Sequence, residues 1–320
     1  MAMIDLPLNE LKQYQGINPR PADLDNYWNS ALQELQAVEP NVELVPGDFT
    51  TNFADCFDLY FTGVRGARIH AKYLRPKKLH EKKCPALLHF HGYGGNSGDW
   101  YDKLPFVATG FVVAALDCRG QGGLSQDVGG VTGCTDTGHI IRGLDDKAEN
   151  LLYHHIFLDT VQLASIVMAQ DHVDPDRLGA MGGSQGGGLA LACAALEPRV
   201  KRTAATFPFL CDYKRAWHLD MDNSAYIELR NFFRQFDPLH EREEEIFTRL
   251  GYIDIQHLVH RIKGQVLMAA TLRDMVCPPS TQFAAFNKIS CAKQLLLYED
   301  HGHEYIPYLS DRIFEFITQI

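Results

Sequence analysis

Residues 178–196 read LGAMGGSQGGGLALACAAL. An apolar run is followed by the motif GGSQG at 182–186 and then by a run of helix-forming residues. Small residues on both sides of Ser184 let a strand turn sharply into a helix, and this turn pushes the serine hydroxyl into solvent in a strained backbone conformation. We therefore predict a strand, a tight turn and a helix, with Ser184 as a nucleophile. An ordinary glycine-rich turn is the alternative.

Outward from this stretch, strand-like and helical patterns alternate along the chain. Short, nearly continuous apolar runs suit strands that are buried on both faces. Such runs occur at 86–90, 111–116, 178–181, 203–207, 266–270 and 294–298. Helical patterns are found at 23–37, 159–170 and 187–196, and an antiparallel hairpin is predicted over 57–74. The alternation predicts an α/β fold with a mostly parallel central sheet flanked by helices.

Residues 211–262 interrupt this alternation with a helical insertion. The segment contains no strand-like run, but three helical ones at 225–236, 241–250 and 253–261. An insertion at the edge where loops carry functional sites resembles a cap over an active site, and a solvated helical decoration is the alternative. No linker divides the chain, so we expect one domain over 1–320, with an N-terminal helical extension over 1–56.

A nucleophilic serine requires a base and an acid that orients the base. In folds with this type of turn, the acid and then the histidine follow the serine along the chain, each on a loop after a later strand. Asp274 directly follows one strand-like run, and the next such run leads to His301 and His303. His303 follows a glycine and lies further beyond the strand end, so we favour it over His301 as the base for Ser184.

Other acids fit the orienting role less well. Asp237 and Asp254 lie within the helical insertion, and Asp300 is adjacent in sequence to the histidines. None of the three follows a strand-like run as Asp274 does. For Asp274 itself, the alternative is an ordinary surface ion pair with Arg273 or another base.

Acyl transfer also requires N–H donors for the developing oxyanion. The backbone N–H of Gln185, directly after the nucleophile, is one candidate. The second is the backbone N–H of Tyr93, in the loop HGYGG that follows the run at 86–90. His89 and His91 alternate in this region, but no further ligand at suitable spacing supports a metal site there, so no metal is predicted.

Arg119, Gly120 and Gln121 follow another strand-like run. The glycine permits a tight loop, and Arg119 can pair with a carboxylate to brace the rim of the site, so we interpret these residues as architectural. The glycine-rich stretches do not match nucleotide-binding motifs, because the chain has no Gly-Lys dipeptide and no complete G-x-G-x-x-G. We therefore expect no cofactor.

Composition argues against several classes of partner. The 320 residues include 30 Lys and Arg and 40 Asp and Glu, for a formal net charge of −10. Nucleic acid and anionic membranes both favour a basic face, so we expect neither as a partner. The N-terminus lacks a secretory pattern, and the eight cysteines are scattered, several within apolar runs. This pattern favours reduced thiols and a cytoplasmic location.

Three motifs in ordered spacing resemble the signature of the cephalosporin C deacetylase and acetyl xylan esterase family. They are RGQ at 119–121, GGSQG at 182–186 and the pair of His303 and Glu304. The likeness extends over nearly the whole chain. One departure is at 151–154, which read LLYH where many family members carry Tyr-Tyr-Tyr-Arg. This departure concerns local packing and oligomer contacts rather than the triad.

The resemblance implies an α/β-hydrolase fold with a triad of Ser184, Asp274 and His303. It also implies an oxyanion hole formed by Tyr93 and Gln185. The implied activity is the removal of acetyl groups from small acetylated xylo-oligosaccharides and from cephalosporin C, without a cofactor. Proteins of this family are commonly hexamers whose active sites face an internal chamber, so a homo-oligomer is expected.

Two kinds of rival function remain open. The same triad serves other acyl-transfer enzymes, such as another short-acyl esterase, a thioesterase, an amidase or a small-peptide hydrolase. From a different class, a catalytically inactive hydrolase fold can serve as a binding module. The intact set of Ser184, Asp274 and His303 argues against this second rival.

Overall fold

The computed structural model describes residues 4–78, 82–131, 135–220 and 224–320. Within them, one nine-stranded sheet forms the centre of the molecule. Its strands are β1 (Glu43–Pro46), β2 (Ala54–Thr62), β3 (Arg68–Pro76), β4 (Cys84–Phe90), β5 (Val112–Leu116), β6 (Val173–Gly183), β7 (Val200–Thr206), β8 (Gln265–Thr271) and β9 (Lys293–Tyr298).

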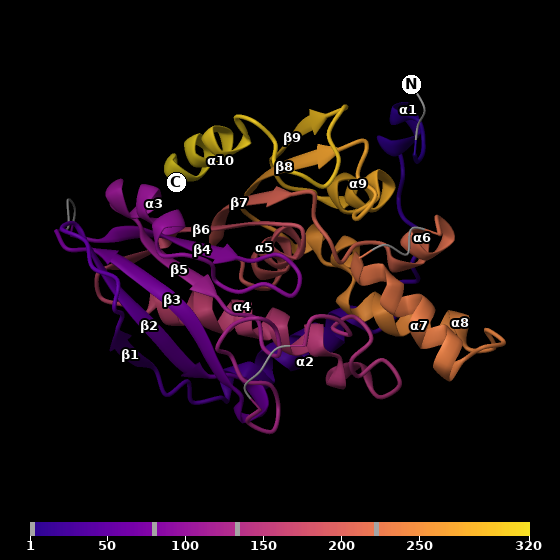
Figure 1. Ribbon diagram of the computed structural model, residues 1–320, viewed down its shortest axis with the longest axis horizontal. Helices are drawn as coiled ribbons and strands as arrows, with labels where there is room; N and C mark the ends of the chain where they lie inside the picture. Colours follow the sequence, from indigo (N-terminus) through magenta and orange to yellow (C-terminus); the bar gives the residue numbers. More distant parts are fainter. Residues whose placement is uncertain (1–3, 79–81, 132–134, 221–223) are drawn as a thin grey trace.

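The strands lie in the order β1-β2-β3-β5-β4-β6-β7-β8-β9 (Figure 1). Pairing is antiparallel from β1 to β5 and parallel from β5 through β4 to β9. The predicted hairpin and the predicted mostly parallel α/β sheet are therefore confirmed. Because the central strands run in the same direction, the loops after β4, β6, β7, β8 and β9 all leave the sheet at the edge formed by the carboxyl ends of these strands.

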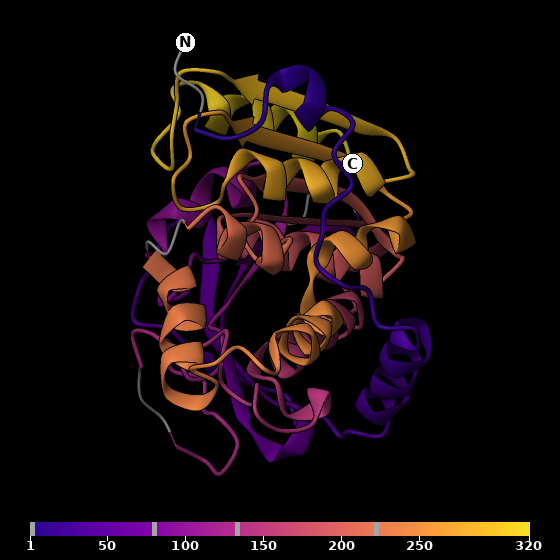
Figure 2. The same ribbon diagram turned by 90° about the vertical axis from the view of Figure 1, so that its right-hand side faces the viewer.

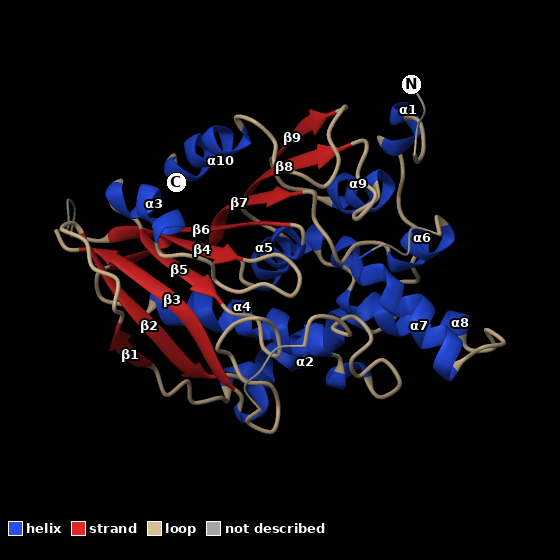
Figure 3. Ribbon diagram, viewed as in Figure 1, coloured by secondary structure: helices blue, strands red, loops and turns tan. Residues whose placement is uncertain are grey.

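Helices cover both faces of the sheet (Figure 3). The helices are α1 (Leu8–Leu11), α2 (Leu24–Gln36), α3 (Leu104–Ala108), α4 (Leu152–Met168), α5 (Gln185–Leu196), α6 (Tyr213–His218), α7 (Ile227–Phe236), α8 (Glu243–Leu250), α9 (Pro279–Lys288) and α10 (Leu309–Thr318). The pair α3 and α10 lies on one face, and α4, α5 and α9 lie on the other. Every residue of β5 and of α5 is buried, which explains their continuous apolar sequences.

The N-terminal segment and the helical insertion contact each other beyond the carboxyl ends of the central strands. Figure 2 shows the segment running from α1 beside α9 to α2, past the insertion helices. The carboxylate of Asp212, at the start of α6, accepts hydrogen bonds from the Tyr14 hydroxyl and the Asn18 N–H, both at 2.8 Å. Asp5 accepts an N–H bond from Ser280 at 2.7 Å, at the start of α9. Polar contacts thus hold the N-terminal segment against the edge that carries the loops.

Three local expectations differ from the structure. The predicted helix at 253–261 is a series of 3₁₀ turns. The Asp254 carboxylate accepts the Gln256 N–H, and apolar and polar side chains are buried alike over 253–259, so the segment has no polar face. The segment 1–56 contains the strand β1 as well as helices. β1 is mostly exposed, so its sequence shows no apolar alternation. The helix α4 begins at Leu152, seven residues before the predicted start, where the whole chain segment is buried.

Several cysteines are buried free thiols, as predicted for reduced side chains. Cys118, Cys193, Cys211 and Cys277 all lie in the interior. Cys134 lies outside the described residues. Among the residues that the structure describes, no helix combines the length and the apolar character needed to span a bilayer.

Residues 151–154, where the sequence departs from the family run, are buried inside the chain. The Tyr153 hydroxyl donates to Gln185 Oε1 at 2.7 Å, and His154 Nδ1 lies 2.6 Å from the Tyr27 hydroxyl. The departure therefore affects packing between α2, α4 and the start of α5.

Burial keeps several interior histidines neutral. It lowers the pKa of His154 to about 3, that of His155 to about 2 and that of His257 to about 3. A histidine in an unfolded chain titrates near about 6.5. Since the folded pKa values are depressed, the unfolded chain binds more protons as the pH falls from about 6.5 toward the folded values, and the free energy of unfolding decreases over that window.

We predict that His257→Gln makes this acid sensitivity shallower. Glutamine preserves an N–H donor for the Asn18 carbonyl, which His257 Nε2 contacts at 3.1 Å, but it takes up no proton on unfolding. The slope of unfolding free energy against pH should fall by about 1.4 kcal/mol per pH unit between pH 6 and 4.5. Urea unfolding at several pH values measures this slope, with the exposed His240→Gln as control. Parallel curves for wild type and His257→Gln contradict the prediction.

Candidate active site

Ser184 occupies a strained turn between β6 and α5. Its φ is 56° and its ψ is −121°, a conformation that is uncommon for a residue with a side chain. A Cβ added to Gly182 would lie 2.4 Å from the Gly186 carbonyl carbon, and one added to Gly186 would lie 2.0 Å from the Phe90 oxygen. The Ser184 N–H donates to Thr206 O on β7 at 3.0 Å. The predicted strand, turn and helix are all present, and the glycines are required by close backbone packing.

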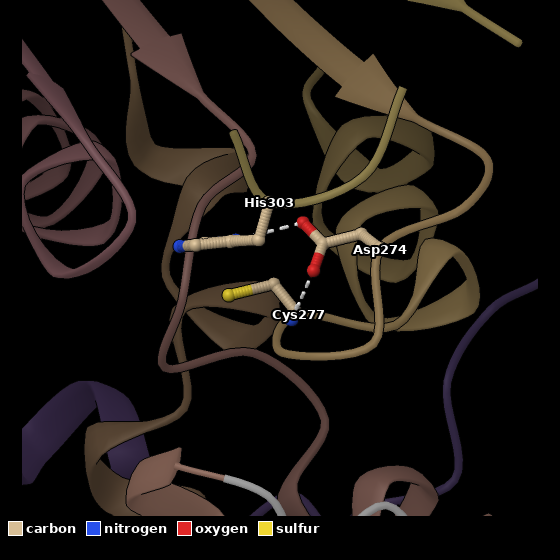
Figure 4. A group of neighbouring side chains, drawn as sticks. All are labelled: Asp274, Cys277 and His303. Carbon is tan, nitrogen blue, oxygen red and sulfur yellow. Dashed lines mark hydrogen bonds and ion pairs between the residues drawn. The ribbon is translucent and has the colours of Figure 1, made fainter. Parts of the chain in front are cut away.

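Asp274 and His303 meet on the loops after β8 and β9. The Asp274 carboxylate is fully buried and accepts the N–H groups of Val276 and Cys277, both at 2.8 Å. Its second oxygen lies 2.9 Å from His303 Nδ1 (Figure 4). The outer nitrogen of His303, Nε2, faces away from the carboxylate (Figure 4). The ring of His301 instead packs beside Tyr298, with centroids 5.8 Å apart.

Two residues connect His303 with Ser184. The ring of Phe207 packs on that of His303, with centroids 4.4 Å apart, and Phe207 follows Thr206, which accepts the Ser184 N–H. Burial raises the pKa of the Cys277 thiol, and the nearby Ser184 side chain opposes that shift. Donor atoms of Cys277, Asp274 and His303 all lie within 4.8 Å of one another. The serine and the histidine therefore border the same thiol at one edge of the sheet.

The competing acids have other partners. The Asp254 carboxylate accepts the N–H of Asp212 at 3.0 Å, and the Asp237 carboxylate accepts the N–H groups of Glu241 and Arg242 before α8. Asp300 lies on an exposed turn. The carboxylate that contacts the histidine is thus the one that follows β8, and its hydrogen bonds replace the surface ion pair considered as an alternative.

Gln121 and Gln185 hold the loop that carries Tyr93. Their side-chain amides form a reciprocal pair, with hydrogen bonds of 2.9 and 3.1 Å. Gln121 Oε1 also accepts the Gly94 N–H at 3.0 Å. No turn or loop hydrogen bond in the described parts of the chain uses the backbone N–H of Tyr93 or Gln185. The Gln121 side chain thus places the Tyr93 loop beside the start of α5.

The remaining signature residues have structural contacts. Arg119 is fully buried and forms a two-point pair with Asp159 of α4, at 2.7 and 2.5 Å. Gly120 has a φ of 70°, which favours glycine. The Glu304 carboxylate accepts the Gly302 N–H at 3.0 Å and so closes the loop that carries the histidine.

His91 is unsuited to a metal role because both of its ring nitrogens have partners. Nδ1 lies 2.7 Å from Gly92 O, and Nε2 accepts the Cys118 N–H at 3.0 Å. Burial lowers the pKa of His89 to about 3.

Glu228, on α7 of the insertion, contacts the Tyr93 loop and was not predicted from the sequence. Its buried carboxylate accepts the Tyr93 hydroxyl, the Gly138 N–H at 2.6 Å and the Ile140 N–H at 2.9 Å. Burial raises the pKa of Glu228, while these donors oppose that shift. A glutamate in an amphipathic helix resembles any solvent-facing residue in sequence, so no local signal distinguishes it.

Cys277 and Asp159 were also missed. Cys277 precedes two prolines, and a single buried cysteine looks like a small apolar residue in sequence. Asp159 falls in a long apolar helix, where a single acid signals burial with a partner but does not indicate which partner.

Comparison with known proteins shows full-length similarity to one family. The family model for acetyl xylan esterase (AXE1) matches residues 1–320. A solved acetyl xylan esterase from a Thermoanaerobacterium species is 60% identical, with coverage of 98% of this chain and 99% of that chain and a TM-score of 0.95. A second solved acetyl xylan esterase, from a Paenibacillus species, is 35% identical, and the match covers 98% of this chain and 99% of that chain with a TM-score of 0.91.

A curated relative is similar over most of this chain. An acetyl esterase of Xylanibacter ruminicola is 28% identical over 289 residues, which are 88% of this chain. The match spans 63% of that relative's length. Together with the solved structures, these similarities confirm the predicted α/β-hydrolase fold class.

We predict that breaking the Arg119–Asp159 pair strongly destabilises the fold. Asp159→Asn preserves the shape of the side chain but leaves a buried guanidinium without a counter-charge, which costs about 3–5 kcal/mol of unfolding free energy. The double variant Arg119→Met with Asp159→Leu removes both charges and should be less destabilised. Urea unfolding followed by circular dichroism compares the two. A loss below about 1 kcal/mol for Asp159→Asn is incompatible with this role.

Proposed function

This chain belongs to the acetyl xylan esterase family, and from that premise we propose that it is a serine carboxylesterase acting on short acyl esters. The proposed substrates are small acetylated xylo-oligosaccharides and cephalosporin C. Two relatives that match over their full length are named acetyl xylan esterases, which supports the acetylated sugar, and the resemblance of the three sequence motifs supports both substrates.

In the proposed reaction, Ser184 Oγ attacks the acetyl carbonyl while His303 Nε2 accepts its proton. Asp274 holds the imidazole through Nδ1, and the N–H groups of Tyr93 and Gln185 bind the oxyanion. His303 then returns the proton to the departing alcohol oxygen, which leaves an acetyl ester on Ser184. Water attacks this ester with His303 again as base, and acetate and the free serine result.

One observation carries this proposal. The buried Asp274 carboxylate binds His303 Nδ1 at 2.9 Å and leaves Nε2 facing away from it, at the edge where Ser184 is held in its strained turn. Asp274 is itself held in place because its carboxylate accepts two backbone N–H bonds. The partner in a solvent-exposed ion pair would be free to move and would not fix the imidazole in this way. The same arrangement favours an active enzyme over an inactive binding module.

We predict that Ser184→Ala lowers kcat by roughly 10⁶, because triad residues act as a unit. A fluorophosphonate probe should label the wild-type chain and leave this variant unlabelled. Acetate release from p-nitrophenyl acetate gives the rates, and the exposed Ser165→Ala serves as the matched control. Turnover retained in Ser184→Ala contradicts the nucleophile assignment.

A substrate panel separates the proposed activity from its rivals. We expect acetate release from acetylated monosaccharides, acetylated xylo-oligosaccharides and cephalosporin C, with acetyl esters cleaved faster than butyryl esters. If active sites open into a closed chamber, polymeric acetylated xylan should be nearly inert. Faster cleavage of a thioester or a small peptide favours the corresponding rival.

We predict that Glu228→Gln lowers kcat by about tenfold with little change in KM. The amide places an N–H₂ group against the donors of Tyr93, Gly138 and Ile140, which weakens the hydrogen bonds that hold the Tyr93 loop. Complete loss of an oxyanion donor lowers kcat by about 10²–10³, so displacement of the loop should have a smaller effect. Steady-state kinetics with an acetyl ester test this effect. The exposed Glu241→Gln is the control, and an equal change in both variants contradicts the role of Glu228.

We further propose a cytoplasmic location and a homo-oligomeric, hexameric assembly. Buried free thiols such as those of Cys118 and Cys193 support a reducing compartment. The family resemblance supports the assembly. Sedimentation of the purified chain distinguishes a hexamer from smaller species.

A further inference from the structure

Cys277 is a buried thiol at the catalytic edge that the proposed reaction does not use. It lies on the loop between Asp274 and α9, and its side chain is fully buried. Its backbone N–H donates to the Asp274 carboxylate at 2.8 Å, and its thiol lies near the Ser184 side chain. The sulfur is thus positioned against the nucleophile by the same loop that holds the acid.

The thiol is close to two other groups that bind metal ions. Among the residues that the structure describes, Asp274, Cys277 and His303 form a group with donor atoms within 4.8 Å of one another. Figure 4 shows the sulfur of Cys277 and Nε2 of His303 directed to the same side, both away from Asp274. Donors that share one Zn²⁺ at about 2.0–2.3 Å lie about 3.3–3.7 Å apart, so binding requires Cys277 Sγ and His303 Nε2 to reach this separation.

The contact between Asp274 and His303 suits a metal-binding histidine. A ligating histidine almost always donates its other ring N–H to a carboxylate, which fixes the ring and raises its basicity. His303 Nδ1 already has this partner at 2.9 Å, and Nε2 is the remaining ligand atom. Thiolate and imidazole together select soft or borderline cations such as Zn²⁺ over Mg²⁺ or Ca²⁺.

We propose that Cys277 Sγ and His303 Nε2 form an inhibitory site for a thiophilic divalent cation, with Zn²⁺ as the representative ion. Ser184 Oγ or water completes the coordination, and Asp274 remains hydrogen-bonded to Nδ1. On binding, the thiol releases its proton to solvent, two metal–ligand bonds form, and bound water leaves the cation, with no change in oxidation state. Because Nε2 is then occupied, the imidazole has no lone pair to accept the serine proton. The inhibition rests on the proposed function, whereas binding does not.

A cobalt titration tests binding independently of activity. Co²⁺ bound by a thiolate has a ligand-to-metal absorption band in the near ultraviolet, which we expect in the wild-type chain. The band should be absent in Cys277→Ser and retained in Cys193→Ala, which changes another fully buried cysteine on α5. If Cys277→Ser does not fold, Cys277→Ala serves the same comparison. A wild-type chain without the band refutes the site.

Zn²⁺ inhibition of acetyl-ester hydrolysis tests the consequence, with each rate normalised to the same variant without metal. We expect the half-inhibitory Zn²⁺ concentration to rise at least about 100-fold in Cys277→Ser. Loss of a residue that only hydrogen-bonds a metal ligand lowers metal affinity about 10–100-fold, and loss of the ligand itself should lower it further. A chelator should restore the wild-type rate, and Mg²⁺ should have no effect. Equal Zn²⁺ sensitivity in wild type and Cys277→Ser refutes the proposal. If the wild-type chain hydrolyses no acetyl ester, the cobalt spectrum still decides the metal site separately.

Discussion

The backbone conformation of Ser184 is the constraint on which the rest of the site depends. A residue with a side chain at φ 56° is held there because β6 and α5 approach so closely that a Cβ at Gly182 would lie 2.4 Å from the Gly186 carbonyl carbon. The strain is sustained by the surrounding sheet and by the wholly buried helix α5. This turn sets the hydroxyl at the edge where the loops after β8 and β9 deliver the acid and the histidine.

Buried polar contacts from distant parts of the chain maintain the loops around that turn. The Arg119–Asp159 pair fixes the loop after β5, Gln121 joins that loop to the Tyr93 loop, and Glu228 attaches the Tyr93 loop to the helical insertion. Each of these groups is buried and hydrogen-bonded, so removing one partner leaves an uncompensated polar group in the interior. The insertion is therefore bound to the predicted oxyanion loop by direct hydrogen bonds.

The hydrogen-bonded imidazole of His303 is suited both to proton transfer and to metal binding. The hydrogen bond that His303 Nδ1 donates to Asp274 would make His303 an effective base and also an effective metal ligand, because both roles require a fixed ring with a free, basic Nε2. The neighbouring thiol of Cys277 decides whether a soft cation finds a second ligand there. A hydrolase of this design is thus expected to combine acyl-transfer chemistry with sensitivity to thiophilic metals, and both depend on the same imidazole.

The features of this protein that are encoded locally could be predicted from the amino-acid sequence. Strand-like apolar runs, the glycine-flanked serine, and an acid and a histidine placed just after strands were sufficient to predict the parallel sheet and to select Ser184, Asp274 and His303. The exposed strand β1 and the 3₁₀ turns at 253–261 were not predictable, because neither has a periodic apolar pattern. Only the tertiary structure paired Arg119 with Asp159, placed Glu228 on Tyr93 and set Cys277 against Ser184. Such contacts join residues that are remote in sequence. They could not be predicted because the spacing of residues along a chain determines only which face of a helix or strand a side chain occupies. The packing of the elements in three dimensions determines which residues that face contacts.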